Sequence, residues 1–589
     1  MNLFDLPPTS LVEFETYKLK NSSLCWINTS VLSEYGFDIN SDQSIKLAGE
    51  EIVQMYAYII PASENSNIDT SQRKIFHGDI YGSEGEISNL GGVRCGADRL
   101  FQIKGIGQNP LVGEYVEFWH SHGGCTLEEA IREAFWSYLF EAELTYGANR
   151  VVAIIATGDE SPFDIDFESL RVPCKPKGVL IVREHSIRPA HFARVVYCTP
   201  KNREKFINYS DVKRTSNAIS YLTKFLPSGN TLVDQLENLA KRYAKTAAEL
   251  KSRRICHGAI TPSNICIDGK LVDFGTATAL PSYMNYQLSE SFPPFWGDHY
   301  SYYGILDSLI FQINKDTNIK INSGSICELF FAEFEKNLEK EFAYNSGFSR
   351  DFIEQNWSIV KSYASKLVTI ARENEPVRTK LYNYCDKSFK CRYEETVKFI
   401  YELIDNDFSI RNDDFVDLKE DLKRLWHSYI AFNAEIKTKN LKRHFLLNNR
   451  KRNKIHPHLY RDFDDAYEMI FKEEISQKTD LINLHGILDK KLSNTLRFSK
   501  NIIDTEALIE LNIISRCGIE IALLFDAIDG KNKILISAHN KNQIGNFIKS
   551  KNLSKYNFKE EKNRISPSMM VPYSREIYDH LIIGGNNEY

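Results

Sequence analysis

Two residues with oxygen-bearing side chains lie nine positions apart in a short segment with the pattern of a metal site. Asn264 ends Thr261-Pro262-Ser263-Asn264, and Asp273 begins Asp273-Phe274-Gly275. The apolar run between them turns at Asp268-Gly269, which favours a hairpin with Asn264 and Asp273 at its open end. Amide and carboxylate oxygens are hard ligands, and Mg²⁺ is commonly bound by such groups together with the phosphates of a nucleotide. The segment therefore predicts a site for Mg²⁺ and ATP.

A His-Gly pair precedes this hairpin at the spacing found in the catalytic loop of protein kinases. His257 stands seven residues before Asn264. In kinases an aspartate two residues after the histidine takes the proton of a hydroxyl acceptor, and that position is Ala259 here. The sequence keeps the metal ligands of a kinase-like fold and lacks its usual base.

A lysine and a glutamate upstream could orient phosphates. Lys104 ends a short alternating strand, and Gly105 and Gly107 follow in a turn whose N–H groups could converge with the ammonium on an anion. Glu133 lies beside the apolar stripe of a helix that begins with the capping box 126–129, where an unpaired carboxylate is costly. We expect a Lys104–Glu133 ion pair. The alternatives are that Lys104 is an exposed lysine of a hairpin and that Glu133 is an exposed residue at the rim of its helix.

Two buried strands are predicted at 151–156 and 178–182 from their length and β-branched content. Arg183 and Arg188 follow the second strand. Their guanidinium groups suit bidentate phosphate binding, and surface salt bridges are the alternative.

The remainder of the chain predicts mainly helices. Helical patterns cover 217–250 and 299–311, and further helices follow to about residue 430. Near the end, a helix is expected around 505–515, followed by a hairpin that turns at Asp529-Gly530. At 589 residues the chain exceeds a single core, and we divide it into 1–200, 201–430 and 431–589. We expect an N-terminal lobe, a helical lobe and an accessory region.

Charge and composition exclude some classes of protein. The 73 basic and 78 acidic side chains give a net charge of −5, which argues against a strongly cationic nucleic-acid binder. The eleven cysteines show no zinc-type spacing, and no apolar run is long enough to span a membrane. We expect a cytoplasmic protein without a nucleic-acid partner.

The order of these motifs resembles the selenoprotein O family. The resemblance rests on the lysine-glycine turn at Lys104, Ile131-Arg132-Glu133, the run 182–192 and the segment 257–275, and it covers roughly residues 20 to 315. The segment 90–94, which ends at Arg94, looks like a degenerate form of another motif. Two departures stand out, because the Arg183 to Arg188 interval is shortened and Ser263 replaces an acidic residue.

This resemblance implies an α+β, protein-kinase-like two-lobed fold, here with an additional C-terminal α/β extension. It further implies a transferase that binds ATP in a flipped orientation and moves AMP to an acceptor. By position, it implies an ion pair of Lys104 and Glu133, phosphate contacts from Arg94, Arg183 and Arg188, and Mg²⁺ ligands Asn264 and Asp273.

The missing base bears on the acceptor. With Ala259 and Ser263 at the two places for a base, a hydroxyl has nothing to deprotonate it, whereas a carboxylate is already ionised at neutral pH. We hypothesise a protein or peptide carboxylate that is activated as an acyl-adenylate. This hypothesis would fit a branch of the family that acts in microcin maturation. The protein would then work with a small acyltransferase-like partner. A kinase-like phosphotransferase and a non-catalytic scaffold stay open as alternatives.

Overall fold

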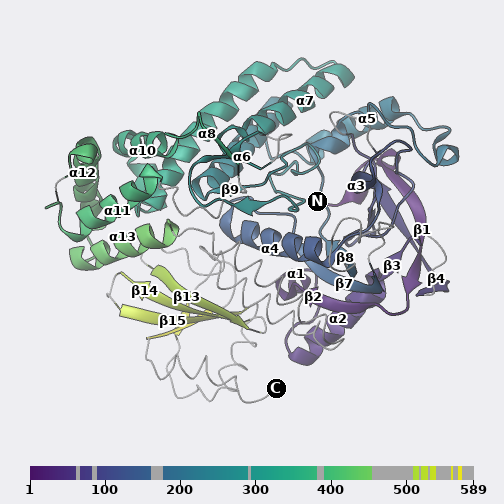
Figure 1. The fold of residues 1–589 in the computed structure, drawn as a ribbon, viewed down its shortest axis with the longest axis horizontal. Coiled ribbons are helices and arrows are strands. Elements are labelled where there is room, and N and C mark those ends of the chain that lie inside the picture. Colours follow the sequence, from purple (N-terminus) through teal and green to yellow (C-terminus); the bar gives the residue numbers. More distant parts are fainter. Residues whose placement is uncertain are drawn as a thin grey trace.

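The computed structural model describes residues 1–453, except 62–66, 83–88, 161–176, 289–292, 381–390 and 411, and five strands between 508 and 572. This part of the chain is α+β. A large sheet with helices on it forms one side of the molecule, helices form the other, and a second sheet lies below them (Figure 1).

The large sheet is antiparallel and has the strand order β2-β7-β8-β6-β5-β4-β1-β3. Its strands are β1 (Leu11–Leu19), β2 (Ser23–Ile27), β3 (Tyr58–Ile59), β4 (Ile68–Asp79), β5 (Cys95–Ala97), β6 (Gln102–Lys104), β7 (Val151–Glu160) and β8 (Lys177–Arg183). The strands predicted around 100–103, 151–156 and 178–182 are confirmed. Because β6 lies between β5 and β8, Lys104 pairs with Cys95 on one side and Ile181 on the other.

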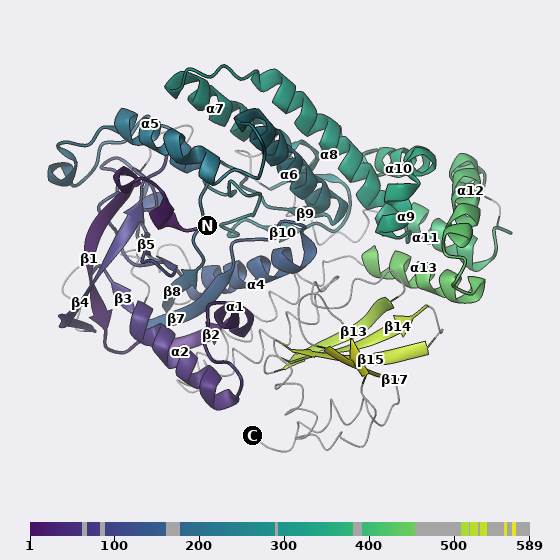
Figure 2. The ribbon, with the colours of Figure 1, turned by 180° about the vertical axis from the view of Figure 1, so that it is seen from behind.

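Four α-helices lie among the described residues of this part of the chain. They are α1 (Thr29–Glu34), α2 (Asp42–Tyr56), α3 (Phe118–Ser121) and α4 (Leu127–Glu143). The predicted helix with Glu133 is α4, which packs against β7 and β8 (Figure 2). Its first turn is capped by Thr126, whose hydroxyl accepts a 3.2 Å bond from the Glu129 N–H.

Helices dominate from 211 to 452. They are α5 (Asp211–Tyr221), α6 (Leu232–Ser252), α7 (Tyr300–Asp316), α8 (Ser323–Asn345), α9 (Arg350–Gln355), α10 (Trp357–Ala371), α11 (Arg392–Asp405), α12 (Val416–Phe432) and α13 (Thr438–Arg452). The helical pattern at 217–250 is split between α5 and α6, because Pro227 cannot continue a helix. The helix predicted at 299–311 is α7, which packs with α6 and α8.

The second sheet has the order β13-β14-β15-β17-β16 and is antiparallel. Its strands are β13 (Leu508–Arg516), β14 (Ile519–Asp526), β15 (Lys531–Ala538), β16 (Lys559–Glu561) and β17 (Ser568–Pro572). The hairpin prediction is confirmed by β14 and β15, and its turn lies outside the described residues. The helix predicted near 505–515 is wrong from Leu508 onward, since pairing with β14 overrides the local pattern. All the described strand pairs of this C-terminal sheet are antiparallel, and none of them is the parallel pair expected of an α/β extension.

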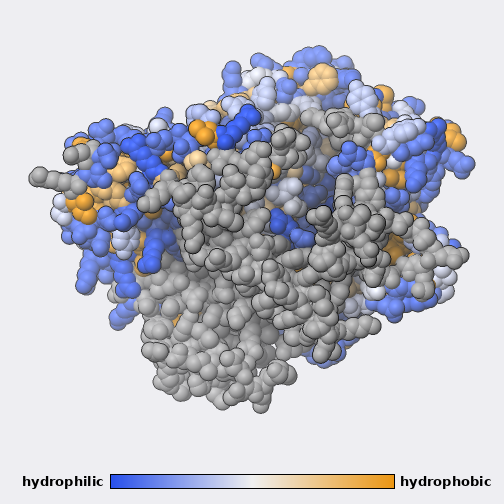
Figure 3. Space-filling model, in the orientation of Figure 1, coloured by the Kyte–Doolittle hydropathy of each residue, from blue (hydrophilic) through white to orange (hydrophobic). Residues whose placement is uncertain are grey.

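The described surface in Figure 3 is mainly hydrophilic, with small groups of hydrophobic side chains. Among the described helices, none combines the length and apolarity needed to cross a membrane.

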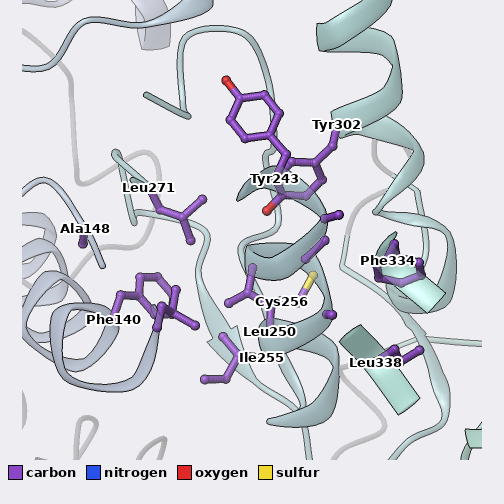
Figure 4. Packing of buried hydrophobic residues seen from close by; sticks show 14 of the residues in the cluster. Phe140, Ala148, Tyr243, Leu250, Ile255, Cys256, Leu271, Tyr302, Phe334 and Leu338 are labelled. Atoms are coloured by element: carbon purple, nitrogen blue, oxygen red, sulfur yellow. The ribbon is translucent and has the colours of Figure 1, made fainter. Parts of the chain in front are cut away.

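A hydrophobic core joins the helical part to the hairpin region. Tyr243 of α6 lies beside Tyr302 of α7, with ring centroids 5.8 Å apart, and Leu338 of α8 borders the same cluster (Figure 4). Leu271 of the hairpin and Phe140 of α4 belong to this cluster. The core therefore holds the hairpin and α4 in fixed positions relative to the helices.

Candidate functional site

The segment from 264 to 273 forms the predicted hairpin. Ile265 and Leu271 make an antiparallel bridge, and the Val272 N–H donates to the Asn264 carbonyl at 3.2 Å. Gly269 adopts a φ of +96° in the turn, a conformation that favours glycine. Asn264 and Asp273 therefore lie at the open end of the hairpin.

Asp273 has an unusual backbone conformation. Its φ is +64°, a left-handed value that costs of order 1 kcal/mol for a residue with a side chain. The following Phe274 is buried and makes edge-to-face contacts with Phe140 and His257, at centroid distances of 5.3 and 5.9 Å. Such strain is often found at functional sites, where the surrounding packing maintains it.

Lys104 lies at the centre of a buried ionic cluster. Its side chain is 2% exposed and its Nζ contacts Glu133, a Glu129 carboxylate oxygen at 2.8 Å, and Asp273 Oδ1 at 3.4 Å. The expected Lys104–Glu133 ion pair is present, and burial of both residues rules out the exposed positions considered for them. Because Asp273 joins this pair, β6, α4 and the hairpin meet at one cation.

Glu129 is a member of this cluster that the sequence analysis missed. Arg94 donates to its two carboxylate oxygens at 2.8 and 3.0 Å, in a bidentate pair. The capping-box interpretation directed the Glu129 side chain to the start of α4, whereas its carboxylate faces Arg94 and Lys104. Its spacing of four residues before Glu133 places both on one helix face, and this signal could have identified it.

The arginine that ends β8 and the one that follows five residues later are buried and held by protein groups. Arg183 donates to Gln102 Oε1 at 2.9 Å and lies 3.5 Å from Glu133 Oε2. Arg188 donates to the Ser263 carbonyl at 3.0 Å, and its guanidinium lies 5.3 Å from the centre of the Tyr81 ring. Arg183 thus belongs to the Lys104 cluster, and Arg188 links the same region to the segment that precedes Asn264.

A buried histidine and aspartate hold these arginines in place. His191 accepts from the Arg188 backbone N–H through Nδ1 at 2.9 Å, so its Nε2 donates to Asp79 at 3.2 Å. The second oxygen of Asp79 accepts from Gln102 at 3.3 Å, and Gln102 accepts from Arg183. Sequence reasoning gave Asp79, His191 and Gln102 no role, because these contacts join distant segments.

Burial and charge act against each other in this cluster. Burial by itself would raise the pKa of the Asp273 carboxyl, but Lys104 and three arginines hold that pKa well below its usual value. The pKa of Glu129 is also lowered, because Lys104 and Arg94 outweigh its burial. Both carboxylates are therefore ionised at neutral pH, and the cluster combines dense positive and negative charge.

The glycine turn after Lys104 is shaped by packing. Gly105 and Gly107 have φ values of +96° and +103°, and a Cβ on them would lie 2.6 Å from the Val179 carbonyl oxygen and 2.5 Å from that of Ile60. Their N–H groups donate to the carbonyls of Arg94 and Gly123. These two N–H groups are bonded to protein carbonyls in this structure, and phosphate binding by the turn stays a prediction.

The donor set at the open end of the hairpin fits a hard cation. The Asn264 amide nitrogen donates to the Ala259 carbonyl at 2.9 Å, and its Oδ1 accepts a long 3.4 Å bond from Ser263. The Asp273 side chain is 37% exposed. Among the described residues, the carboxylate oxygens of Glu129, Glu133 and Asp273 also lie within 4.8 Å of one another. Oxygen ligands of this kind suit Mg²⁺.

No model of a known protein family matches the sequence, and no curated protein matches it.

Replacing Lys104 with methionine tests whether its charge balances the cluster. We expect Lys104→Met to lower the free energy of unfolding by about 3 kcal/mol, because the buried Glu133 and the partly buried Glu129 and Asp273 lose their shared cation. One of them should then take up a proton on folding. Its folded pKa would lie above the unfolded value, so stability should rise as pH falls, approaching about 1.4 kcal/mol per pH unit for one proton.

Urea unfolding at about pH 8 and pH 6 measures this difference, since both values lie above the unfolded pKa of a carboxyl group. Lys46→Met is the matched control, because Lys46 is 71% exposed and its Nζ lies 3.9 Å from a carboxylate oxygen of the exposed Glu50. A Lys104→Met protein with the stability and pH dependence of the control would contradict the role given to Lys104.

Proposed function

We propose that this protein is a Mg²⁺- and ATP-dependent nucleotidyltransferase with a kinase-like site, which transfers AMP to a carboxylate of a protein or peptide. The observation that carries the proposal is the meeting of Lys104, Glu133 and Asp273 in one cluster. A strand lysine, a helix glutamate and a hairpin aspartate are the groups that position nucleotide phosphates in kinases. The resemblance to the selenoprotein O family supports AMP transfer over phosphate transfer.

The charged groups have separate tasks under this proposal. Asn264 and Asp273 would hold Mg²⁺, which neutralises phosphate charge when bound. Lys104 and Arg94 would contact the phosphates, since guanidinium and ammonium groups bind both carboxylates and phosphates. Arg183 and Arg188 would supply further positive charge, and their fixed positions would limit reorganisation during the reaction.

The absence of a base defines the reaction. An ionised carboxylate oxygen of the acceptor would attack the α-phosphorus of ATP, the bond from that phosphorus to the bridging oxygen would break, and pyrophosphate would leave. No proton is transferred, so the reaction needs neither the aspartate that kinases carry at the position of Ala259 nor the acidic residue that the selenoprotein O family carries at the position of Ser263. Ser263, whose hydroxyl is 3.0 Å from that of Thr261, could orient the acceptor by a hydrogen bond.

Labelled ATP tests the carboxylate acceptor. With ATP radiolabelled at the α-phosphate and candidate acceptors, we expect label on the acceptor that hydroxylamine releases as AMP, because a mixed anhydride is cleaved by this nucleophile and leaves a hydroxamate. Asp273→Asn should abolish the labelling. Label that resists hydroxylamine would show AMP on a hydroxyl side chain and would overturn the carboxylate acceptor.

Glu129 should compete with ATP for the same cations. Its carboxylate occupies Arg94 and Lys104 as a phosphate would. We expect Glu129→Gln to bind ATP about three- to tenfold more tightly, because a neutral amide gives up these cations more readily. Calorimetric titration with Mg²⁺ and an ATP analogue carrying a methylene bridge between the α- and β-phosphorus measures the affinity.

The neighbouring Glu128 is exposed, so Glu128→Gln changes the same net charge without touching the cluster and serves as the control. Unchanged or weaker binding in Glu129→Gln would show that Glu129 does not compete with the phosphates.

A further inference from the structure

We propose that a groove beside the candidate site binds the acceptor peptide, and that it selects an apolar side chain with acidic neighbours. The groove lies between α7 and the short 3-10 helix η3 (Pro189–Phe192). That its occupant is the acceptor rests on the proposed function. The selectivity for apolar and acidic side chains rests on the groove itself.

The groove and the candidate site share one segment of chain. Arg188, the residue before η3, faces the Ser263 carbonyl, whereas Pro189 and Phe192 of η3 line the groove. The Ala190 N–H donates to the Pro262 carbonyl at 3.0 Å, and Pro262 is itself a wall of the groove. A peptide bound in the groove would contact Pro262, which precedes Ser263 and the proposed metal ligand Asn264 in the chain.

The size of the groove fits one side chain. Its volume is about 220 Å³, below the roughly 300–1,000 Å³ of typical small-molecule sites. Its apolar walls come from η3, from the segment that follows it and from α7, and they include Pro189, Phe192, Val196, Ile305, Leu309 and Phe311. A leucine or phenylalanine side chain could be buried among these groups, whereas a nucleotide could not.

Two cations border the groove. Arg194 is paired with Asp211 at 3.1 Å. Lys315 also lines the groove, and the described residues give it no ion pair; its Nζ lies 5.9 Å from the centre of the Phe311 ring. A peptide carboxylate beside the apolar anchor could form an ion pair with this exposed lysine. Basic residues at the same place would be repelled.

The rim of the groove is apolar and exposed. Val196 is 60% exposed and Phe311 is 63% exposed, and they belong to opposite walls. The helices α5 and α7, which both contact η3, lie side by side in Figures 1 and 2. Exposed apolar residues on both walls of a groove that Lys315 borders are typical of a binding surface for a peptide with an apolar anchor.

Direct binding tests this proposal without requiring catalysis. The probe is a fluorescein-labelled peptide with one phenylalanine between two glutamates in a glycine-serine background, measured by fluorescence anisotropy. We expect it to bind, and we expect replacement of the phenylalanine by serine, or of the glutamates by lysine, to weaken binding about tenfold.

Two variants locate the binding surface. Ser308→Trp fills the groove from the surface of α7, and Lys315→Glu reverses its unpaired charge; each should weaken binding about tenfold. Lys361→Glu makes the same charge change at an exposed position of α10, outside the groove, and should leave binding unchanged. Circular dichroism establishes that each variant is folded.

Equal binding of all peptides, or binding that neither groove variant weakens, would overturn the proposal. Concentration-dependent self-association that Ser308→Trp abolishes, without specific peptide binding, would show an interface between copies of this chain instead. Peptide binding without AMP transfer would leave the groove in place and contradict the proposed function. Failure of the groove proposal and failure of the proposed function therefore give different results.

Discussion

The buried ammonium of Lys104 is the physical constraint on which the arrangement of the site depends. A cation with 2% exposure requires anions around it, and these come from two turns of α4 and from the end of the hairpin. The carboxylates of Glu129, Glu133 and Asp273 in turn require a cation between them, because they would repel one another without Lys104. Sheet, helix and hairpin are therefore held together by charge balance as well as by the apolar core beneath them.

Charge balance also limits what can bind. Four cations, Arg94, Lys104, Arg183 and Arg188, face the carboxylates of Glu129, Glu133, Asp273 and Asp79. A polyphosphate brings further negative charge to this balanced cluster. If the proposed function is right, the polyphosphate can bind only together with a divalent cation, and one carboxylate of the cluster must give up its contacts with the cations. Glu129 is the carboxylate best placed to do so, because it bridges Arg94 and Lys104 near the partly exposed side of the cluster.

Local sequence patterns predicted the strands and helices of the site and the Lys104–Glu133 ion pair. They did not predict the wider hydrogen-bond and ion-pair network around it. The strand before Lys104, the helix of Glu133 and the hairpin from Asn264 to Asp273 carry short-range signals of periodicity and turn chemistry. Gln102 and the Asp79–His191 pair are set by contacts between segments far apart in sequence, which no local pattern encodes. For the same reason β13 was predicted as a helix, since its partner strand decides its conformation.

The nucleotide product of Mg²⁺-ATP turnover tests the central claim most directly. Phosphorus NMR of the wild-type protein with Mg²⁺, ATP and an acceptor peptide distinguishes the bond that is broken. We predict pyrophosphate, with no ADP, and no turnover by Asp273→Asn. ADP as the product would contradict AMP transfer, and a protein that neither binds nor consumes Mg²⁺-ATP would contradict the assignment of this cluster as a nucleotide site.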